Sequence, residues 1–319
     1  MIGTVSHTAQ VLQAADHILI LTHRRPDGDT TGSAGALCLA LRKAGKIAYV
    51  ARNAGVTKRY AGLIEPYAPP EDYQPECVVS VDCADSDMIP PEMQQHADRV
   101  DVVIDHHRSN PGFGRENLVI GHRAACAEIV CAVIEEMGIA LDCEIATGIY
   151  VGASTDTGCF RFSNTTANTH LVAAKCLEAG VDGGEINRAL FETKSRARYE
   201  IERILFSSME FYHEGKIAVA LITLEARQRT GADWDDLDAI AGIPRQIEGV
   251  EVGLTLTELE NGDTKVSVRT TKEVDASAIC TQLGGGGHLR AAGATLHCGA
   301  EETVYRLLEA TERVYRGEA

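Results

Sequence analysis

The sequence predicts an α/β protein of two domains: a doubly wound domain with a mostly parallel sheet, and a smaller mixed α/β domain after it. Short apolar runs typical of buried strands alternate with helical segments over the first 180 residues. This alternation is typical of a parallel sheet with helices on both faces. From residue 216 the pattern changes to a run of strands, the last of which alternates apolar and polar residues. We therefore expect domains at residues 1–190 and 213–319, joined by a helical connector at 191–212.

Four strands and six helices are expected in the first domain. Runs rich in Val, Ile and Leu predict strands at residues 18–21, 47–51, 77–81 and 100–104. Helices are predicted at residues 4–15, 32–44, 93–97, 125–137, 142–153 and 169–179. Gly45, Gly138 and Gly180 each follow a predicted helix, where glycine commonly ends it. Three prolines between residues 67 and 75 predict a loop.

The second domain is expected to follow a charged helix at residues 194–211, whose apolar stripe includes Ile201 and Leu205. Strands are predicted at residues 217–223, 250–258 and 264–270. A four-glycine loop at 284–287 and a closing helix at 301–315 complete the chain. The sequence shows no internal repeat that would change this division.

Composition and charge are those of an ordinary globular protein with an acidic surface. The 319 residues carry a formal net charge of −16, which argues against a protein that binds duplex nucleic acid through charge alone. No apolar run approaches the roughly 20 residues of a membrane helix. The first ten residues lack the pattern of a signal peptide, so we expect a cytoplasmic protein. The ten cysteines contain no Cys-x-x-Cys pair and are expected to be reduced and mostly buried.

Acidic and histidine residues follow three of the predicted strands, and one more carboxylate lies in a Ser/Thr/Gly turn after a long apolar segment. In chain order these residues are His23, Asp27, Asp29, Asp82, Asp105, His106, His107 and Asp156. Because the carboxyl ends of parallel strands lie at one edge of a sheet, these side chains can converge. Carboxylates and imidazoles that lie together need a cation, and this mixture of ligands suits Mn²⁺ or Mg²⁺. The sequence therefore predicts a metal site.

Each of these residues also has an ordinary structural interpretation. A single Asp after a strand is usually a helix N-cap or a turn residue. His23 by itself would more often be a hydrogen-bonded core histidine, and His106 with His107 could be a surface pair. The combination of three strand ends with Asp156 favours the metal site over these interpretations.

The order of these motifs resembles that of the DHH phosphoesterase family. The resemblance rests on His23-x-x-x-Asp27-x-Asp29, Asp82, Asp105-His106-His107, the run at residues 152–158, and Gly284-Gly285-Gly286-Gly287-His288. The last of these looks like the signature of the DHHA1 domain. The resemblance covers nearly the whole chain, and the run from Asp156 to Phe162 is similar to the two-domain branch of bifunctional oligoribonuclease/PAP phosphatases.

This resemblance implies a site for two metal ions, usually manganese. One ion would be held by His23, Asp27, Asp82 and Asp156, and the other by Asp29, Asp82, His106 and Asp156. Asp105 would orient a metal ligand without binding the metal itself, and His107 would face the scissile phosphate as an acid or electrostatic aid. Two such ions can activate a water and neutralise the phosphate, so no Ser or Cys nucleophile is required.

The resemblance also implies that the second domain binds substrate. Gly285, Gly286 and Gly287 would let backbone N–H groups approach a phosphate, and His288 would add a donor. Arg269 resembles the family's phosphate-binding arginine. Without the resemblance, the glycine run would be interpreted as a flexible turn and Arg269 as a solvated strand residue. The glycine run is not a dinucleotide fingerprint, because the spacing and the following acidic residue are missing.

One stretch departs from the family pattern. Where relatives often place Ser or Thr before the Ala-Glu of a helix, this chain has Ala124-Ala125-Cys126-Ala127-Glu128. If those hydroxyls touch substrate in the relatives, substrate preference differs here.

The expected function is therefore that of a metal-dependent phosphodiesterase, exoribonuclease and nucleotide phosphatase. Its substrates would be short RNA or DNA oligonucleotides, linear dinucleotides included, and 3′-phosphoadenosine 5′-phosphate (PAP). Alternatives are a cyclic-dinucleotide phosphodiesterase and an inorganic pyrophosphatase or polyphosphatase, while a nucleotide sensor without catalysis is a further rival. The residues after the first strand exclude a dinucleotide-binding dehydrogenase, because Asp and His stand where a glycine fingerprint would be. A homodimer is compatible with the sequence.

Overall fold

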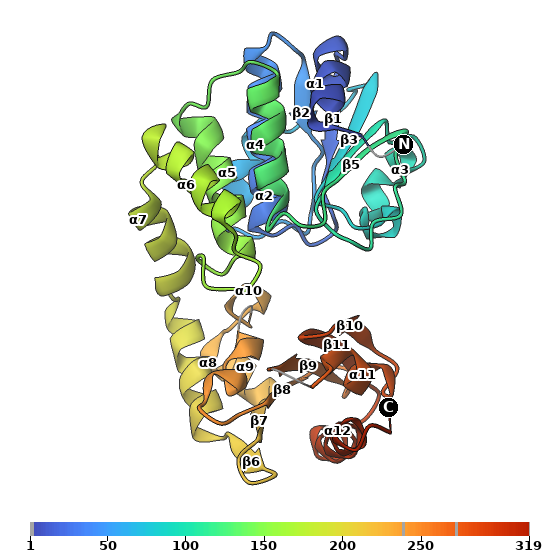
Figure 1. The fold of residues 1–319 in the computed structure, drawn as a ribbon. Coiled ribbons are helices and arrows are strands. Elements are labelled where there is room, and N and C mark those ends of the chain that lie inside the picture. Colours follow the sequence, from blue (N-terminus) through green and yellow to red (C-terminus); the bar gives the residue numbers. More distant parts are fainter. Residues whose placement is uncertain (1–2, 238–239, 272–273, 319) are drawn as a thin grey trace. The chain divides into compact units, whose positions relative to one another are not determined.

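The apolar runs of the first domain form a five-stranded parallel sheet with the order β2-β1-β3-β4-β5 (Figure 1). The computed structural model describes residues 3–237, 240–271 and 274–318. The strands are β1 (Ile18–Leu21), β2 (Ala48–Val50), β3 (Cys77–Val81), β4 (Val102–Asp105) and β5 (Glu116–Val119). β1, β3 and β4 are buried along their whole length, as expected for strands covered on both faces. The sequence pattern did not indicate β5, since Glu116 and Asn117 break its apolar character.

Helices cover both faces of this sheet, which confirms the predicted fold class. On one face lie α1 (Val5–Ala14), α2 (Gly28–Lys43), α4 (Cys126–Glu136), α5 (Cys143–Asp156) and α6 (Ala167–Glu178) (Figure 1). The other face is covered by α3 (Gln94–Ala97) and the turns before it, where Ile89 and Met93 pack against Leu19 and Val78. The segment α7 (Gly183–Asn187) and a π-helical turn, Arg188–Glu192, end this part of the chain.

Glycines allow α2 and α5 to pack unusually close together. A Cβ atom on Gly32 would lie 2.2 Å from the carbonyl oxygen of Gly148, so no side chain fits there. On Gly152, a Cβ atom would lie 2.7 Å from the carboxylate oxygen Oδ1 of Asp29. The helix that carries Asp29 is therefore in direct contact with the helix that carries Asp156.

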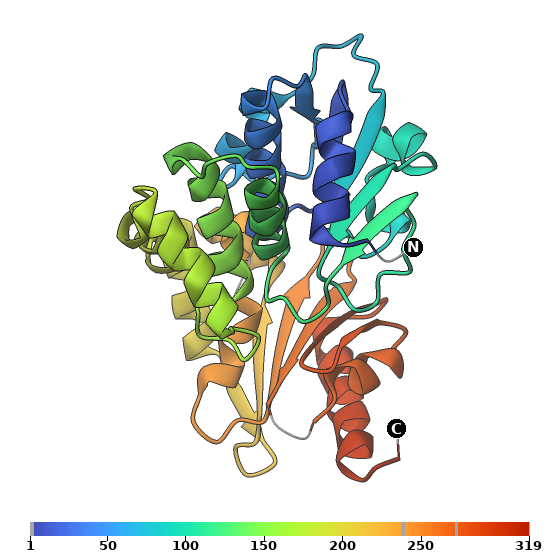
Figure 2. The same ribbon diagram turned by 45° about the horizontal axis from the view of Figure 1, so that its top comes forward.

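The second part of the chain forms a mixed six-stranded sheet with the order β10-β11-β9-β8-β7-β6. Its strands are β6 (Glu210–Tyr212), β7 (Ile217–Ile222), β8 (Val252–Glu258), β9 (Thr264–Thr270), β10 (Gly286–His288) and β11 (Ala291–Leu296). β7 and β8 are parallel and the other pairs antiparallel. The helices α11 (Ala276–Thr281) and α12 (Ala300–Tyr315) pack on one face (Figure 2). The other face carries α8 (Arg196–Ser207) and α9 (Leu224–Thr230), followed in sequence by α10 (Trp234–Leu237).

The chain divides into two compact units, Met1–Thr193 and Lys194–Ala319, which we call unit 1 and unit 2. The charged helix α8 is shorter than the predicted segment 194–211, because Phe211 already pairs with Ala218 in the sheet of unit 2. All ten cysteines are free thiols, and seven of them are buried. Within the described residues, no helix has both the length and the apolar character needed to cross a membrane.

Candidate metal centre

The carboxyl ends of β1, β3 and β4 bring the predicted ligands together. They form three overlapping groups, and within each group the candidate ligand atoms all lie within 4.8 Å of one another. The groups are His23 with Asp27 and Asp82, then Asp29 with His106 and Asp156, and finally Asp82 with Asp105, His106 and His107. Residues from four distant stretches of sequence thus meet at one edge of the sheet, as the strand pattern predicts.

Asp27 begins the helix that carries the next ligand. Its Oδ1 accepts hydrogen bonds from the backbone N–H groups of Asp29 (3.0 Å) and Thr30 (3.1 Å), so Asp27 is the N-cap of α2. α2 starts at Gly28, four residues before the predicted start at 32. Asp29 therefore belongs to the first turn of a helix rather than to a loop.

Asp29 is buried and caps a second helix. Its Oδ2 accepts a hydrogen bond from the backbone N–H of Cys126 (2.6 Å), and its Oδ1 accepts one from Ala127 (2.9 Å). These are the first two residues of α4, whose N-cap residue, Ala125, offers no side-chain acceptor. The N-terminus of α4 is thus capped by a carboxylate from α2 rather than by its own N-cap side chain, and the positive end of α4 favours such a group.

Asp82 belongs to two of the three ligand groups, and one of its oxygens receives no hydrogen bond within the described residues. Its backbone is left-handed, with φ 52°, and its Oδ2 accepts a 2.6 Å hydrogen bond from Thr30 Oγ1. Oδ1 is buried, and within the described part of the chain no group donates a hydrogen bond to it. Burial favours the neutral acid, but His106, His107 and Thr30 outweigh it and lower the pKa of Asp82. This buried anionic oxygen receives no hydrogen bond from the described residues, and it lies 3.4 Å from a ring nitrogen of His106 and 3.7 Å from one of His107. Such an oxygen is costly unless cationic groups surround it, so these residues fit a metal.

The Asp105 carboxylate forms a hydrogen bond with the ring of His107. Its Oδ1 accepts hydrogen bonds from the backbone N–H groups of His106 (2.8 Å) and His107 (3.2 Å), and lies 2.8 Å from Nδ1 of His107. Its Oδ2 accepts a 2.6 Å bond from Asn110 Nδ2. The hydrogen bond to Asp105 raises the pKa of His107. The fully buried Asp105 carboxylate is therefore well suited to orient His107.

His106 points its Nε2 atom at three carboxylates. Nε2 lies 3.4 Å from Asp82, 3.5 Å from Asp156 and 3.8 Å from Asp29, while Nδ1 is 3.3 Å from the carbonyl oxygen of Arg123. Burial lowers the pKa of His106, but the three carboxylates outweigh it and raise the pKa to about 10. Nε2 therefore occupies the position from which a histidine would bind a cation shared with these carboxylates.

Asp156 is the last residue of α5 and not part of the turn that the sequence predicts. Within the helix, Ser154 and Thr155 direct their hydroxyl groups back to the carbonyl oxygen of Val151, so these hydroxyls do not form the expected turn. Burial, followed by the charge of Asp82, raises the pKa of Asp156 to about 7.

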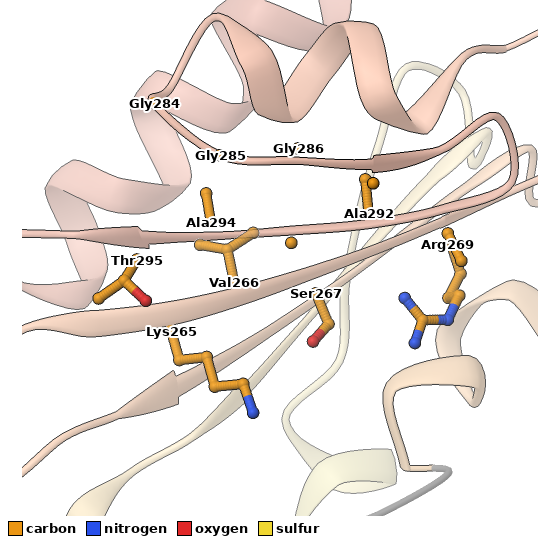
Figure 3. A pocket seen from close by; sticks show the side chains of 13 residues that line it. Lys265, Val266, Ser267, Arg269, Gly284, Gly285, Gly286, Ala292, Ala294 and Thr295 are labelled. Atoms are coloured by element: carbon orange, nitrogen blue, oxygen red, sulfur yellow. The ribbon is translucent and has the colours of Figure 1, made fainter. Parts of the chain in front are cut away.

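Unit 2 contains the other predicted site residues, and all of them except His288 line a cavity of about 670 Å³ (Figure 3). Arg269 and Gly284 to Gly287 line it, and one Arg269 nitrogen donates a hydrogen bond to the carbonyl oxygen of Val268 (3.0 Å). The glycine run is not a simple loop, since Gly286 and Gly287 belong to β10. A Cβ atom on Gly285 would lie 2.2 Å from the carbonyl oxygen of Gly293, so close strand packing requires glycine there. The backbone of His288 ends β10, and its side chain lies outside the described part of the structure.

Two family descriptions match the two parts of the chain. The DHH family N-terminal domain matches residues 17–153, and the DHHA1 domain matches residues 214–317. A protein of Thermus thermophilus named bifunctional oligoribonuclease and PAP phosphatase NrnA is 35% identical over 306 residues, which span 95% of this chain and 91% of the relative. The chain belongs to the DHH family. The resemblance carried by the motifs is therefore confirmed.

A second curated relative and two solved structures also match this chain over most of their own length. A Bacillus subtilis protein with the same name is 24% identical over 294 residues, spanning 88% of this chain and 90% of the relative. An exopolyphosphatase-related protein from Bacteroides fragilis superposes with a TM-score of 0.88 and 25% identity, covering 97% of this chain and 95% of that one. The exonuclease RecJ bound to manganese shares the fold, with a TM-score of 0.53, 14% identity and coverage of 99% and 95%.

Several residues that shape this DHH family site carried no signal in the sequence. Thr30 bonds Asp82, and Asn110 bonds Asp105, but neither lies in a recognisable motif. Asn110 follows the histidine pair by three residues, which is the one hint the sequence offers. Arg123 contributes a backbone carbonyl oxygen, and backbone groups leave no trace in residue type.

Binding of a divalent cation near pH 7 is expected to release protons from this site. In the metal-free protein His106, with a pKa of about 10, carries a proton, and Asp156, with a pKa of about 7, is about half protonated. A cation displaces both protons, so its affinity should increase as the pH rises from 6 to 8. Calorimetric titration with Mg²⁺ in two buffers of different ionisation enthalpy counts the protons, and identical heats in both buffers would contradict this expectation.

Proposed function

We propose that the chain is a two-metal phosphoesterase that hydrolyses short oligonucleotides, linear dinucleotides included, to mononucleotides, and PAP to AMP. The observation that carries the proposal is that two groups of candidate metal ligands share Asp82, whose buried Oδ1 receives no hydrogen bond within the described residues. The names of the Thermus and Bacillus relatives support this substrate class. The free, mostly buried cysteines fit a cytoplasmic location.

Two Mn²⁺ ions are the proposed cofactors, with Mg²⁺ as the alternative. His23 and Asp27 would hold one ion and Asp29 and His106 the other, with Asp82 and Asp156 available to both. The ions would supply an activated water and positive charge to neutralise the phosphate. Oxygen ligands with a few imidazoles match the preference of these ions.

The protein's own acid is His107. Its Nδ1 is held by Asp105, which leaves the opposite ring nitrogen, Nε2, to donate a proton to the departing oxygen of the substrate. Because the Asp105 hydrogen bond raises the pKa of His107, more of it carries that proton near neutral pH. Asp105 acts through His107 and is a positioning residue.

Substrate phosphate would be bound in unit 2. We assign this role to Arg269, Gly285, Gly286, Gly287 and His288. Gly286 is exposed and a Cβ atom there would meet nothing within 4 Å, so its backbone is open to a ligand. The guanidinium of Arg269 offers the paired donors that phosphate oxygens accept.

The test is hydrolysis of a 5′-phosphorylated RNA dinucleotide with Mn²⁺, with and without EDTA. We expect mononucleotide release that EDTA abolishes, and release of AMP from PAP in the same preparation. Parallel reactions with a cyclic dinucleotide, pyrophosphate and polyphosphate separate the alternatives. Faster turnover of pyrophosphate or polyphosphate than of the dinucleotide would overturn the proposed substrate class.

A further inference from the structure

A row of polar side chains lies along one side of strand β9. Thr264, Val266, Val268 and Thr270 are buried, whereas Lys265, Ser267 and Arg269 are partly exposed. Figure 3 shows these three side chains pointing to the same side of the strand, where they line the cavity of about 670 Å³. Lys265 and Arg269 are four residues apart, which separates their Cα atoms by about 13 Å in a strand. Two cations thus stand at different positions along the cavity, although the chain as a whole is strongly acidic.

Trp234 adjoins this row at Lys265. It is the single tryptophan of the sequence, and 48% of its surface is exposed. The Lys265 ammonium nitrogen lies 4.8 Å from the centroid of its ring, and the Arg227 guanidinium carbon lies 4.4 Å from it. A tryptophan this exposed contributes little to the core. Its ring instead contacts two cations, which favour the face of an indole ring.

The two cations differ in their side-chain chemistry. The Nε–H group of Arg227 is buried, and it finds no hydrogen-bond acceptor within the described residues. Lys265 carries a compact charge on a flexible stem. Its ammonium group can therefore move from the ring to a phosphate while a flat ligand group takes its place over the indole.

We propose that Trp234 and Lys265 form a subsite for an outer nucleotide of the substrate, with the base stacked on Trp234 and its phosphate paired with Lys265. A stacking aromatic beside a cation is the arrangement that binds single-stranded nucleic acid without selecting its sequence. The inference rests on the proposed function, and it adds a specificity determinant to it. PAP is a single nucleotide and contacts the cavity only near Arg269, whereas an oligonucleotide contacts it near both Arg269 and Lys265.

Binding can be measured without turnover, because the single tryptophan reports on its own surroundings. Metal-free protein in EDTA is titrated with a 5′-phosphorylated RNA trinucleotide and, separately, with PAP, and tryptophan fluorescence is recorded. We expect saturable quenching by the trinucleotide and a much smaller change with PAP. No quenching by the trinucleotide, or equal quenching by both ligands, would overturn the subsite.

Variants give the second measurement. In Trp234→Leu, the ratio of kcat/KM for the trinucleotide to that for PAP should fall about tenfold or more, the loss expected for one base stack. Trp234→Phe retains a stacking ring and should lose less, and Lys265→Met should shift the ratio in the same direction as Trp234→Leu. The control is Tyr305→Leu, which alters an aromatic residue of unit 2 that is 69% exposed and should leave the ratio unchanged.

The outcomes separate the subsite from its alternatives. If both substrates lose activity equally in Trp234→Leu, the ring merely holds the structure together and the proposal fails. If the wild-type protein hydrolyses neither substrate, the proposed function fails, and the fluorescence titration with trinucleotide still decides whether the subsite binds nucleotides.

Discussion

The Asp82→Asn variant is expected to lose at least about a thousandfold in kcat on a dinucleotide, because metal ions contribute several kcal/mol to stabilising such a transition state. Asp82 provides the buried oxygen that receives no hydrogen bond within the described residues, and it is near His23 and Asp27 as well as His106. Asparagine suits the left-handed backbone at this position better than alanine does, so the variant changes the charge and keeps the turn.

Loss of the metal should also be visible without substrate. Mn²⁺ is expected to raise the unfolding temperature of the wild-type protein, since it binds the folded state, and to raise that of Asp82→Asn much less. The difference between unfolding temperatures with and without Mn²⁺ is the measured quantity, so a change in intrinsic stability does not confuse the result. Asp98→Asn, at an exposed aspartate of unit 1, is the matched control. Wild-type activity in Asp82→Asn would refute the metal assignment.

The Gly152→Ala variant should impair both folding and metal binding. Its new methyl group would lie 2.6 Å from Cβ of Ala127 and 2.7 Å from Oδ1 of Asp29. Overpacking of this kind costs about 1–3 kcal/mol of folding free energy. Because the Asp29 carboxylate must move, we also expect metal affinity to fall about 10- to 100-fold, as for other changes that misorient a ligand.

Chemical denaturation and calorimetric titration measure the two effects separately. Gly62→Ala is the matched control, since a Cβ atom at Gly62 meets nothing within 4 Å. A Gly152→Ala protein with lower stability but unaltered metal affinity would show that Asp29 is not a ligand.

The sequence was informative where polar residues follow apolar strands. A buried strand leaves a continuous apolar run, so the residue pattern alone placed His23, Asp82 and His106 at one sheet edge. The prediction was wrong where the residue composition of a stretch is typical of a conformation that the stretch does not adopt. The stretch around Asp156 has the composition of a turn, yet α5 runs through it to Asp156, and the hydroxyls of Ser154 and Thr155 bond back to the helix.

Other features depend on contacts between distant segments and leave no mark on local sequence. The cap that Asp29 provides for α4 involves backbone groups nearly a hundred residues away. The glycine run was expected to be a loop, but it contributes to β10 because Gly285 tolerates the close approach of β11. The contact between Trp234 and Lys265 joins a short helix to a strand and has no sequence signature.

Buried and partly exposed residues alternate along β9, and this alternation determines which of them can be exchanged. Residues 264, 266, 268 and 270 are buried, so exchanging them endangers the fold, whereas residues 265, 267 and 269 are partly exposed and line the cavity. Evolution or protein engineering can therefore vary the three cavity residues with little risk to folding. Unit 1 offers no such freedom around Asp29, where neighbouring helices leave no room for a methyl group. Substitutions in β9 are thus the most direct way to a new substrate preference, because they leave the candidate metal site of unit 1 unchanged.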